Sequence, residues 1–341
     1  MDHVKVLKRA WEILWRYRVL WVFGLILALT AGTAGNQFTS SWSGDWEGFE
    51  IPTPVIPPQA VATVIAIVLG LVCLGIILTV ARFVFHYIAQ TALIRMVDDH
   101  EETGERRGVR QGFRLGWSRT TLRLFIIDLL TRLPGILVIL LLVLLGMGLF
   151  ALIMLARENV AVIVIATVTG IGVGFLVILA GIVVSLVVSL LRQFFWRVCA
   201  LEEMGVIDSL RQGYAFVRQH LGDAIIMWLI MLGLEIAWII TMIPVVLLLL
   251  VVAAIFGGLP ALLVGGLANL AFEGAIPWIL AAVVGIPIFI LAMAAPLMFL
   301  GTLAEVFKST VWTLTYRELR ALEGIEAEPE PLPELNSPDV G

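Results

Sequence analysis

Residues 135–156 read GILVILLLVLLGMGLFALIMLA and contain no charged side chain. A bilayer core of about 30 Å requires roughly 20 apolar residues in a helix, because each residue rises about 1.5 Å. This segment is therefore long enough to cross a membrane as one helix. Five further runs without charge lie at 19–34, 60–81, 161–191, 236–256 and 276–304. The sequence thus predicts an all-α integral membrane protein with six transmembrane helices.

The composition of the whole chain supports this class of protein. Of its 341 residues, 60% are hydrophobic and 14% are charged, whereas a soluble domain averages about 25% charged residues. The 22 Lys and Arg residues are outnumbered by 26 Asp and Glu residues, a balance that argues against binding to nucleic acid. Cys73 and Cys199 are the only cysteines and both lie in apolar runs, which excludes a disulfide-stabilised scaffold.

The basic residues distinguish the two sides of the membrane. Most of the Lys and Arg residues fall in four segments, 1–18, 98–123, 192–218 and 308–320. The connections at 35–59 and 257–275 contain none, and the second is Gly-rich, as expected of a short re-entrant or interfacial helix. Because Lys and Arg near membrane spans are retained in the cytoplasm, we expect both termini to be cytoplasmic. The predicted location is the bacterial plasma (inner) membrane.

The first apolar run has a second interpretation, a secretory signal peptide. Its last residues, 30–34, are Thr-Ala-Gly-Thr-Ala, which are small enough for a cleavage site. The basic region before it is long and carries Trp11, Glu12 and Trp15 at helical spacing, whereas the basic region of a signal peptide is short and unpatterned. We therefore interpret the run as a retained span.

Three short segments share one pattern of aliphatic, basic, polar or basic, small and aromatic residues. They are LKRAW at 7–11, VRQGF at 109–113 and LRQGY at 210–214. Their small residues, Ala10, Gly112 and Gly213, are separated by 102 and 101 positions. Constant spacing predicts three repeated hairpins, each led by a basic amphipathic helix. The predicted units are 1–111, 112–212 and 213–323, followed by an acidic, Pro-rich and disordered tail at 324–341.

These lead helices are predicted to lie in the membrane interface. In the first, Val4, Leu7 and Trp11 recur at spacings of three and four, which places them on one helical face. The predicted lipid-facing cations are Lys8, Arg9, Arg110 and Arg211, and each can pair with an anionic headgroup. We expect membrane lipid and a membrane protein as partners. The alternative interpretation is that these helices recognise no specific lipid and only set the orientation and depth of the membrane spans.

Six polar residues are predicted at membrane depth: Arg82, His86, Gln90, Asp128, Arg132 and Glu235. Such groups are costly unless they are paired or hydrated, so they either line a polar cavity at the inner leaflet or form structural pairs. Asp128 and Arg132 are one helical turn apart and are expected to neutralise each other before a helix break at Pro134. Glu235 needs a cation from another helix, with Arg132 or Arg82 as candidates.

The sequence offers few groups for catalysis. It contains no Walker-type phosphate loop, no His-Glu-x-x-His, no Cys-x-x-Cys and no Gly-x-Ser-x-Gly. The four histidines, His3, His86, His100 and His220, are spread over different segments. We therefore expect no catalytic residue, no metal site and no cofactor.

The three units, their lead patterns and the stretch STVWTLTYREL at 309–319 resemble a broad bacterial group of six-helix membrane proteins. That group is similar to the membrane domain of glycerophosphoryl diester phosphodiesterases, and the resemblance covers most of residues 1–322. In those enzymes a soluble barrel after the membrane domain carries the catalytic residues, so the resemblance transfers none of them to this chain.

These observations together predict a non-enzymatic accessory, scaffold or lipid-interacting module. A transporter or permease with a polar cavity at the inner leaflet is the main alternative, because it would explain both the repeats and the polar residues. A membrane enzyme that modifies lipid is a third interpretation.

Overall fold

The computed structural model describes residues 1–30, 58–155 and 159–326, with the backbone alone described at 58–64 and 324–326. The connection predicted at 35–59 and the disordered tail predicted at 324–341 lie outside these residues, except for 58–59 and 324–326, which are helical. All regular secondary structure in the described ranges is helical. The prediction of an all-α protein is confirmed to that extent.

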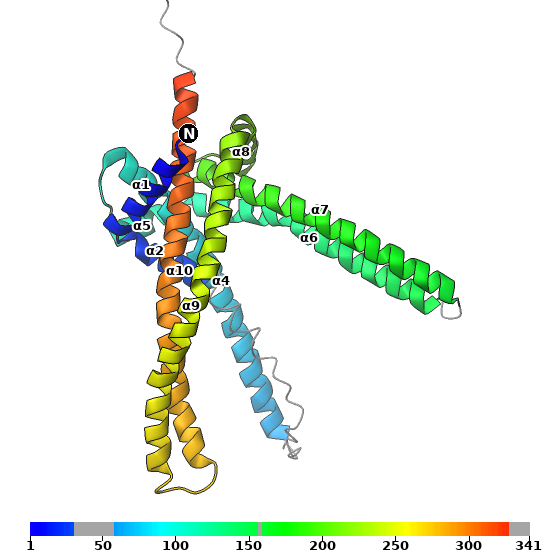
Figure 1. Cartoon of the computed structure of the whole chain (residues 1–341), viewed down its shortest axis with the longest axis vertical. Helices are drawn as coiled ribbons and strands as arrows, with labels where there is room; N and C mark the ends of the chain where they lie inside the picture. Colours follow the sequence, from blue (N-terminus) through cyan, green and yellow to red (C-terminus); the bar gives the residue numbers. More distant parts are fainter. Residues whose placement is uncertain (31–57, 156–158, 327–341) are drawn as a thin grey trace, which may run out of the picture. The chain divides into compact units, whose positions relative to one another are not determined.

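Figure 1 shows the helices of the described ranges. They are α1 (His3–Arg16), α2 (Leu20–Thr30), α4 (Pro58–Thr103), α5 (Val109–Gly116), α6 (Arg119–Leu155), α7 (Val160–Leu201), α8 (Val206–Gln219), α9 (Leu221–Ala268) and α10 (Ile276–Glu326). Five of these, α4, α6, α7, α9 and α10, are long and apolar enough to cross a membrane. The pair α1 and α2, bent by 101°, makes a sixth span if it is counted as one. The protein is thus a polytopic membrane protein.

The long helices continue through positions where the sequence predicted an interruption. Pro134 lies inside α6, so the break expected there is absent from the described helix. Residues 257–268 form the last turns of α9 rather than a separate re-entrant or interfacial helix. Unpaired backbone groups are costly in lipid, so a long apolar helix tolerates a proline or several glycines without ending.

Contacts divide the chain into two compact units, and helices α1, α6, α9 and α10 each contribute residues to both. Unit 1 contains Met1–Ala10, Ile126–Trp228 and Val311–Gly341, and unit 2 contains Trp11–Phe125 and Leu229–Thr310. The predicted organisation into three repeats is a different division of the chain, and it stays a prediction.

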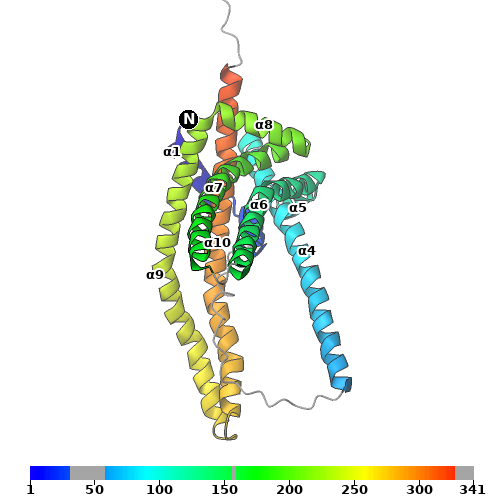
Figure 2. The same ribbon diagram turned by 90° about the vertical axis from the view of Figure 1, so that its right-hand side faces the viewer.

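In unit 1, α6 and α7 lie side by side as an antiparallel pair (Figures 1 and 2). Their close approach depends on Gly181, because a Cβ atom there would lie 2.7 Å from Cγ1 of Val138. The core of this unit lies at the C-terminal end of α7. There the ring of Phe194 packs on Phe216 of α8 and on Trp312 of α10, with ring centres 5.9 and 5.8 Å apart.

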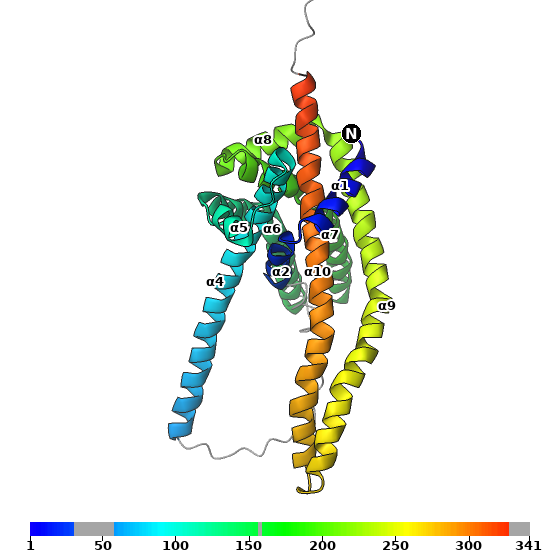
Figure 3. The same cartoon turned by 90° about the vertical axis from the view of Figure 1, so that its left-hand side faces the viewer.

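In unit 2, α9 and α10 form a second antiparallel pair (Figure 3). Gly257 and Gly285 face each other there, since a Cβ atom on Gly257 would lie 2.8 Å from the carbonyl oxygen of Gly285. The helix α2 packs beside α4 and against α10, where a Cβ atom on Gly24 would lie 2.9 Å from the carbonyl oxygen of Thr302. Glycine is therefore required at these crossings because backbones approach closely.

Candidate functional site

A buried carboxylate lies between two arginines at the end of the α6–α7 pair that is remote from residues 156–158. Nε of Arg132 donates a hydrogen bond of 2.7 Å to Asp128, and Nη1 of Arg192 donates one of 3.3 Å to its other oxygen. The side chain of Asp128 is 3% exposed, whereas those of Arg132 and Arg192 are 59% and 31% exposed. The predicted pairing of Asp128 with Arg132 is confirmed, and Arg192 is a partner that sequence reasoning missed.

Arg192 also stacks on an aromatic ring. Its guanidinium carbon lies 5.0 Å from the ring centre of Trp196, one turn further along α7, which is a favourable cation–π distance. Nε of Arg192 is buried and has no hydrogen-bond partner among the described residues. Trp196 and Asp128 thus fix the plane of this guanidinium group while one of its buried donors stays unused by the described part of the chain.

A second set of contacts joins α2 to α4. Nε of Arg82 donates a hydrogen bond of 2.7 Å to the carbonyl oxygen of Thr30, and the hydroxyl of Thr30 lies 3.0 Å from Nδ1 of His86. Gln90, one turn after His86, is buried. Arg82 and His86 therefore hold the described end of α2 against α4. For these two residues, this arrangement agrees with structural pairing rather than with the lining of a polar cavity.

The third set contains Glu235 and lies between α9 and α10. Nζ of Lys308 is 2.5 Å from Oε1 of Glu235, and the two side chains are 38% and 53% exposed. Glu305, one turn before Lys308, interacts electrostatically with both groups. The expectation that Arg132 or Arg82 would pair with Glu235 is wrong, because the register of α9 against α10 brings Lys308 to it instead.

The predicted lipid-facing cations lie on three short helices. Lys8 and Arg9 on α1, Arg110 on α5 and Arg211 on α8 are all exposed. The small residues of the shared pattern, Ala10, Gly112 and Gly213, are buried on the same helices. Each of these helices therefore turns its small residue inward and presents at least one cation to its surroundings.

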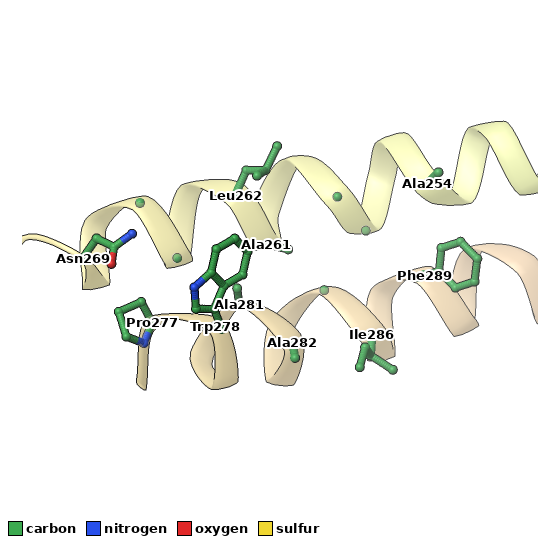
Figure 4. A pocket seen from close by; sticks show the side chains of 15 residues that line it. Ala254, Ala261, Leu262, Asn269, Pro277, Trp278, Ala281, Ala282, Ile286 and Phe289 are labelled. Carbon is green, nitrogen blue, oxygen red and sulfur yellow. The ribbon is translucent and has the colours of Figure 1, made fainter. Parts of the chain in front are cut away.

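A groove of about 580 Å³ lies between α9 and α10 near the turn that joins them. Figure 4 shows Asn269 at one end of this groove and Phe289 at the other. Glycine, alanine and bulky apolar residues make up most of its lining, and none of its lining residues is charged. The groove thus provides shape without a group for acid–base or nucleophilic chemistry. Within the described ranges, no three His, Cys, Asp or Glu side chains gather as metal ligands.

Comparison with known proteins places these features in a family. Residues 7–322 match a family of unknown function, DUF7544. The chain belongs to this family. No curated protein and no solved structure matches the chain. The resemblance to the membrane domain of the phosphodiesterases therefore stays a prediction.

The region shared with the family includes all three sets of polar contacts and all three short basic helices. Ion pairs of this kind hold charges near a membrane at low cost, because each charge is compensated. Paired guanidinium groups also suit phosphate, since their planar donors match its oxygens. Anion binding is thus the chemistry that the described site supports most directly.

Proposed function

We propose that this protein is a non-enzymatic, lipid-interacting accessory module of the bacterial plasma membrane. The observation that carries the proposal is the geometry of α1, α5 and α8. Each has an exposed basic face opposite a face packed on the protein. A helix fixed in this way holds its cations at one depth, where they attract anionic headgroups at about 1 kcal/mol per cation.

Helix α1 shows this arrangement most fully. Val6, Ile13 and Leu14 are buried, whereas Trp11 and Trp15 are exposed on the same helix as Lys8. Tryptophan rings prefer the headgroup layer because one end of the ring is apolar and the other can donate a hydrogen bond. The exposed tryptophans and cations of α1 therefore suit the membrane interface, with the buried face anchoring the helix.

Helices α5 and α8 support the repeat as part of the same proposal. A Cβ atom on Gly112 would lie 2.5 Å from Sδ of Met96, and one on Gly213 would lie 2.5 Å from Cδ1 of Phe195. Both glycines thus sit at a tight crossing on an aromatic or sulfur-containing side chain. Two of the three small residues in the sequence pattern are thus closely packed, which supports the proposed repeat.

Lipid selectivity tests this proposal. In bilayers of mixed phosphatidylglycerol and phosphatidylcholine, spin-labelled lipids report the preference of the protein for each headgroup. We expect wild type to prefer phosphatidylglycerol, and Arg9→Gln, Arg110→Gln and Arg211→Gln to weaken that preference by similar amounts. Arg211→Lys is the matched control and should retain it. Equal selectivity in wild type and in all three neutral variants would overturn the proposal.

The proposed orientation places both termini in the cytoplasm. Single cysteines at Ser43, Gly258 and Ser337, in a background lacking Cys73 and Cys199, should label from outside at the first two positions. Ser337 should label only from inside. External labelling at Ser337 would contradict this topology.

Transport is a second candidate, and one observation favours it. Glu235 pairs with Lys308, and Glu305 lies one turn before Lys308 and interacts electrostatically with both, beside apolar runs long enough to cross a membrane. Ionisable groups in such positions mark proton and ion pathways in carriers. Proteoliposomes loaded with a pH-sensitive dye should then show a proton flux that Glu235→Gln abolishes. Identical flux in wild type, Glu235→Gln and empty liposomes would remove this candidate.

A further inference from the structure

The two arginines around Asp128 lie at the boundary of the apolar part of the α6–α7 pair. Arg132 directly precedes the charge-free residues 133–155 of α6, and Arg192 directly follows the charge-free residues 160–191 of α7. Because the helices are antiparallel, both guanidinium groups lie at the same end of the pair. In a membrane, such a boundary coincides with the layer of phospholipid phosphate groups.

The positive charge at this end exceeds what the one carboxylate can balance. Asp128 accepts hydrogen bonds from both Arg132 and Arg192, so two cations share one anion. The described contacts of Arg132 use only its Nε, and those of Arg192 leave its buried Nε without a partner. Several guanidinium N–H groups therefore remain as donors for a further anion.

The spacing of the two guanidinium groups is fixed by their neighbours. Asp128 is almost fully buried and holds both through opposite oxygens. Trp196 holds the plane of Arg192 by stacking at 5.0 Å. Preorganised donors bind phosphate with less loss of side-chain entropy than mobile ones, and arginine matches phosphate geometry better than lysine does.

We propose that Arg132 and Arg192 together bind the phosphate group of an anionic phospholipid in the inner leaflet. The inference rests on the proposed lipid-interacting function and names the headgroup site within it. Arg132 and Arg192 are the binding residues. Asp128 and Trp196 are positioning residues that act through the two arginines.

The surroundings of the site favour a lipid over free phosphate. Leu129 and Leu133 on α6, and Leu186 and Val187 on α7, are large apolar residues close to the arginines in sequence and are exposed. Exposed aliphatic side chains beside a cationic pair provide contacts for acyl chains below the headgroup. A soluble phosphate ion would gain the charge interaction alone, so it should bind more weakly.

Native mass spectrometry tests the proposal on the full-length protein, stripped of lipid in detergent and titrated with phosphatidylglycerol. We expect one tightly bound lipid in wild type and an affinity about tenfold lower, equal to about 1.4 kcal/mol, in the Arg132→Lys/Arg192→Lys variant. Lysine keeps both charges and loses the planar donors. Lys308→Gln, which removes a cation from the other helix pair, is the matched control and should bind as wild type does.

A second variant covers the case in which the lysine variant does not fold. Asp128→Asn/Arg132→Gln/Arg192→Gln removes all three charges together, so none of the three is left without its partners in this site, and the variant should fold and lose the tight lipid. Retention of wild-type affinity by this variant would overturn the site. Inorganic phosphate should displace the lipid only at far higher concentration. Displacement by phosphate at the same concentration as phosphatidylglycerol would overturn the assignment to lipid and indicate a free-phosphate site.

This outcome is separable from failure of the proposed function. If the site is wrong but the function is right, the triple variant keeps its tight lipid while Arg9→Gln, Arg110→Gln and Arg211→Gln still weaken lipid selectivity. If the function itself is wrong, wild type shows neither a tight phosphatidylglycerol molecule nor a preference for it in bilayers.

Discussion

The α6–α7 and α9–α10 pairs are both antiparallel helix pairs with a charged cluster at one end, and the two clusters have net charges of opposite sign. In each, charged residues flank long apolar runs at the end of the pair remote from its connecting turn. In α6–α7, two arginines pair with Asp128. In α9–α10, Lys308 pairs with Glu235, and Glu305 is a second carboxylate one turn before Lys308. The first pair therefore has unused cationic donors and the second an unused carboxylate.

Burial separates the two sites further. The central group of α6–α7, Asp128, is 3% exposed, whereas Lys308 and Glu235 of α9–α10 are 38% and 53% exposed. A buried carboxylate depends on its partners, because water cannot replace them. An exposed ion pair depends on its partner little, since water solvates either charge. The same hairpin design thus yields a site that stabilises the fold in one case and a weakly coupled one in the other.

The largest effect should follow from removing both partners of Asp128. Arg132→Gln/Arg192→Gln leaves a buried carboxylate without a cation from this site, which costs about 3 kcal/mol or more. Thermal unfolding in detergent measures the loss as a lower melting temperature. Adding Asp128→Asn should recover most of it. Equal melting temperatures for the double and triple variants would contradict the view that Asp128 depends on these arginines.

Helix packing gives the next largest effect. Gly257→Ala in α9 places a methyl group 2.8 Å from the carbonyl oxygen of Gly285, and backbone yields little, so we expect a loss of about 2 kcal/mol. Gly258→Ala is the matched control, because a Cβ atom there has no neighbour within 4 Å. Gly181→Ala in α7 places its methyl group 2.7 Å from Cγ1 of Val138, a side-chain atom rather than backbone, and should cost less. Because alanine favours helix more than glycine does, Gly258→Ala should keep or raise the stability. A loss at Gly258 as large as at Gly257 would contradict the view that packing against Gly285 sets the cost.

The smallest effect should come from Glu235→Gln. Its pair with Lys308 is exposed on both sides, and Lys308 keeps Glu305 nearby, so the loss should be about 1 kcal/mol or less. The same thermal unfolding assay measures it. A loss as large as that of Arg132→Gln/Arg192→Gln would contradict the view that the exposed Glu235–Lys308 pair contributes less to stability than the buried Asp128 site.

Those features that depend on local spacing could be predicted from the sequence. The length of the apolar runs predicted α4, α6, α7, α9 and α10, because bilayer thickness sets the length of a spanning helix. The four-residue interval between Asp128 and Arg132 predicted their ion pair, because that interval is one turn. Neither inference needs to know which helices are neighbours.

Features that depend on the register between helices could not be predicted. Arg192 lies 64 positions from Asp128, and Lys308 lies 73 positions from Glu235. A shift of one residue in the register between two helices would turn the partner side chain to another face of its helix. The glycines at 257–268 led to a wrong prediction for the same reason. Their low helix propensity favours a break in the helix, but the close packing of Gly257 on Gly285 keeps α9 helical.

A direct measurement of the distance between a lipid phosphate and an arginine tests the central claim. In bilayers containing phosphatidylglycerol, solid-state dipolar recoupling between ³¹P and ¹⁵N-labelled arginine side chains detects guanidinium groups within about 5 Å of phosphate. We predict a strong coupling in wild type that is markedly reduced in the Asp128→Asn/Arg132→Gln/Arg192→Gln variant. An Arg110→Gln variant should retain most of it. A coupling of equal strength in wild type and the triple variant would contradict the assignment of a phospholipid phosphate to Arg132 and Arg192.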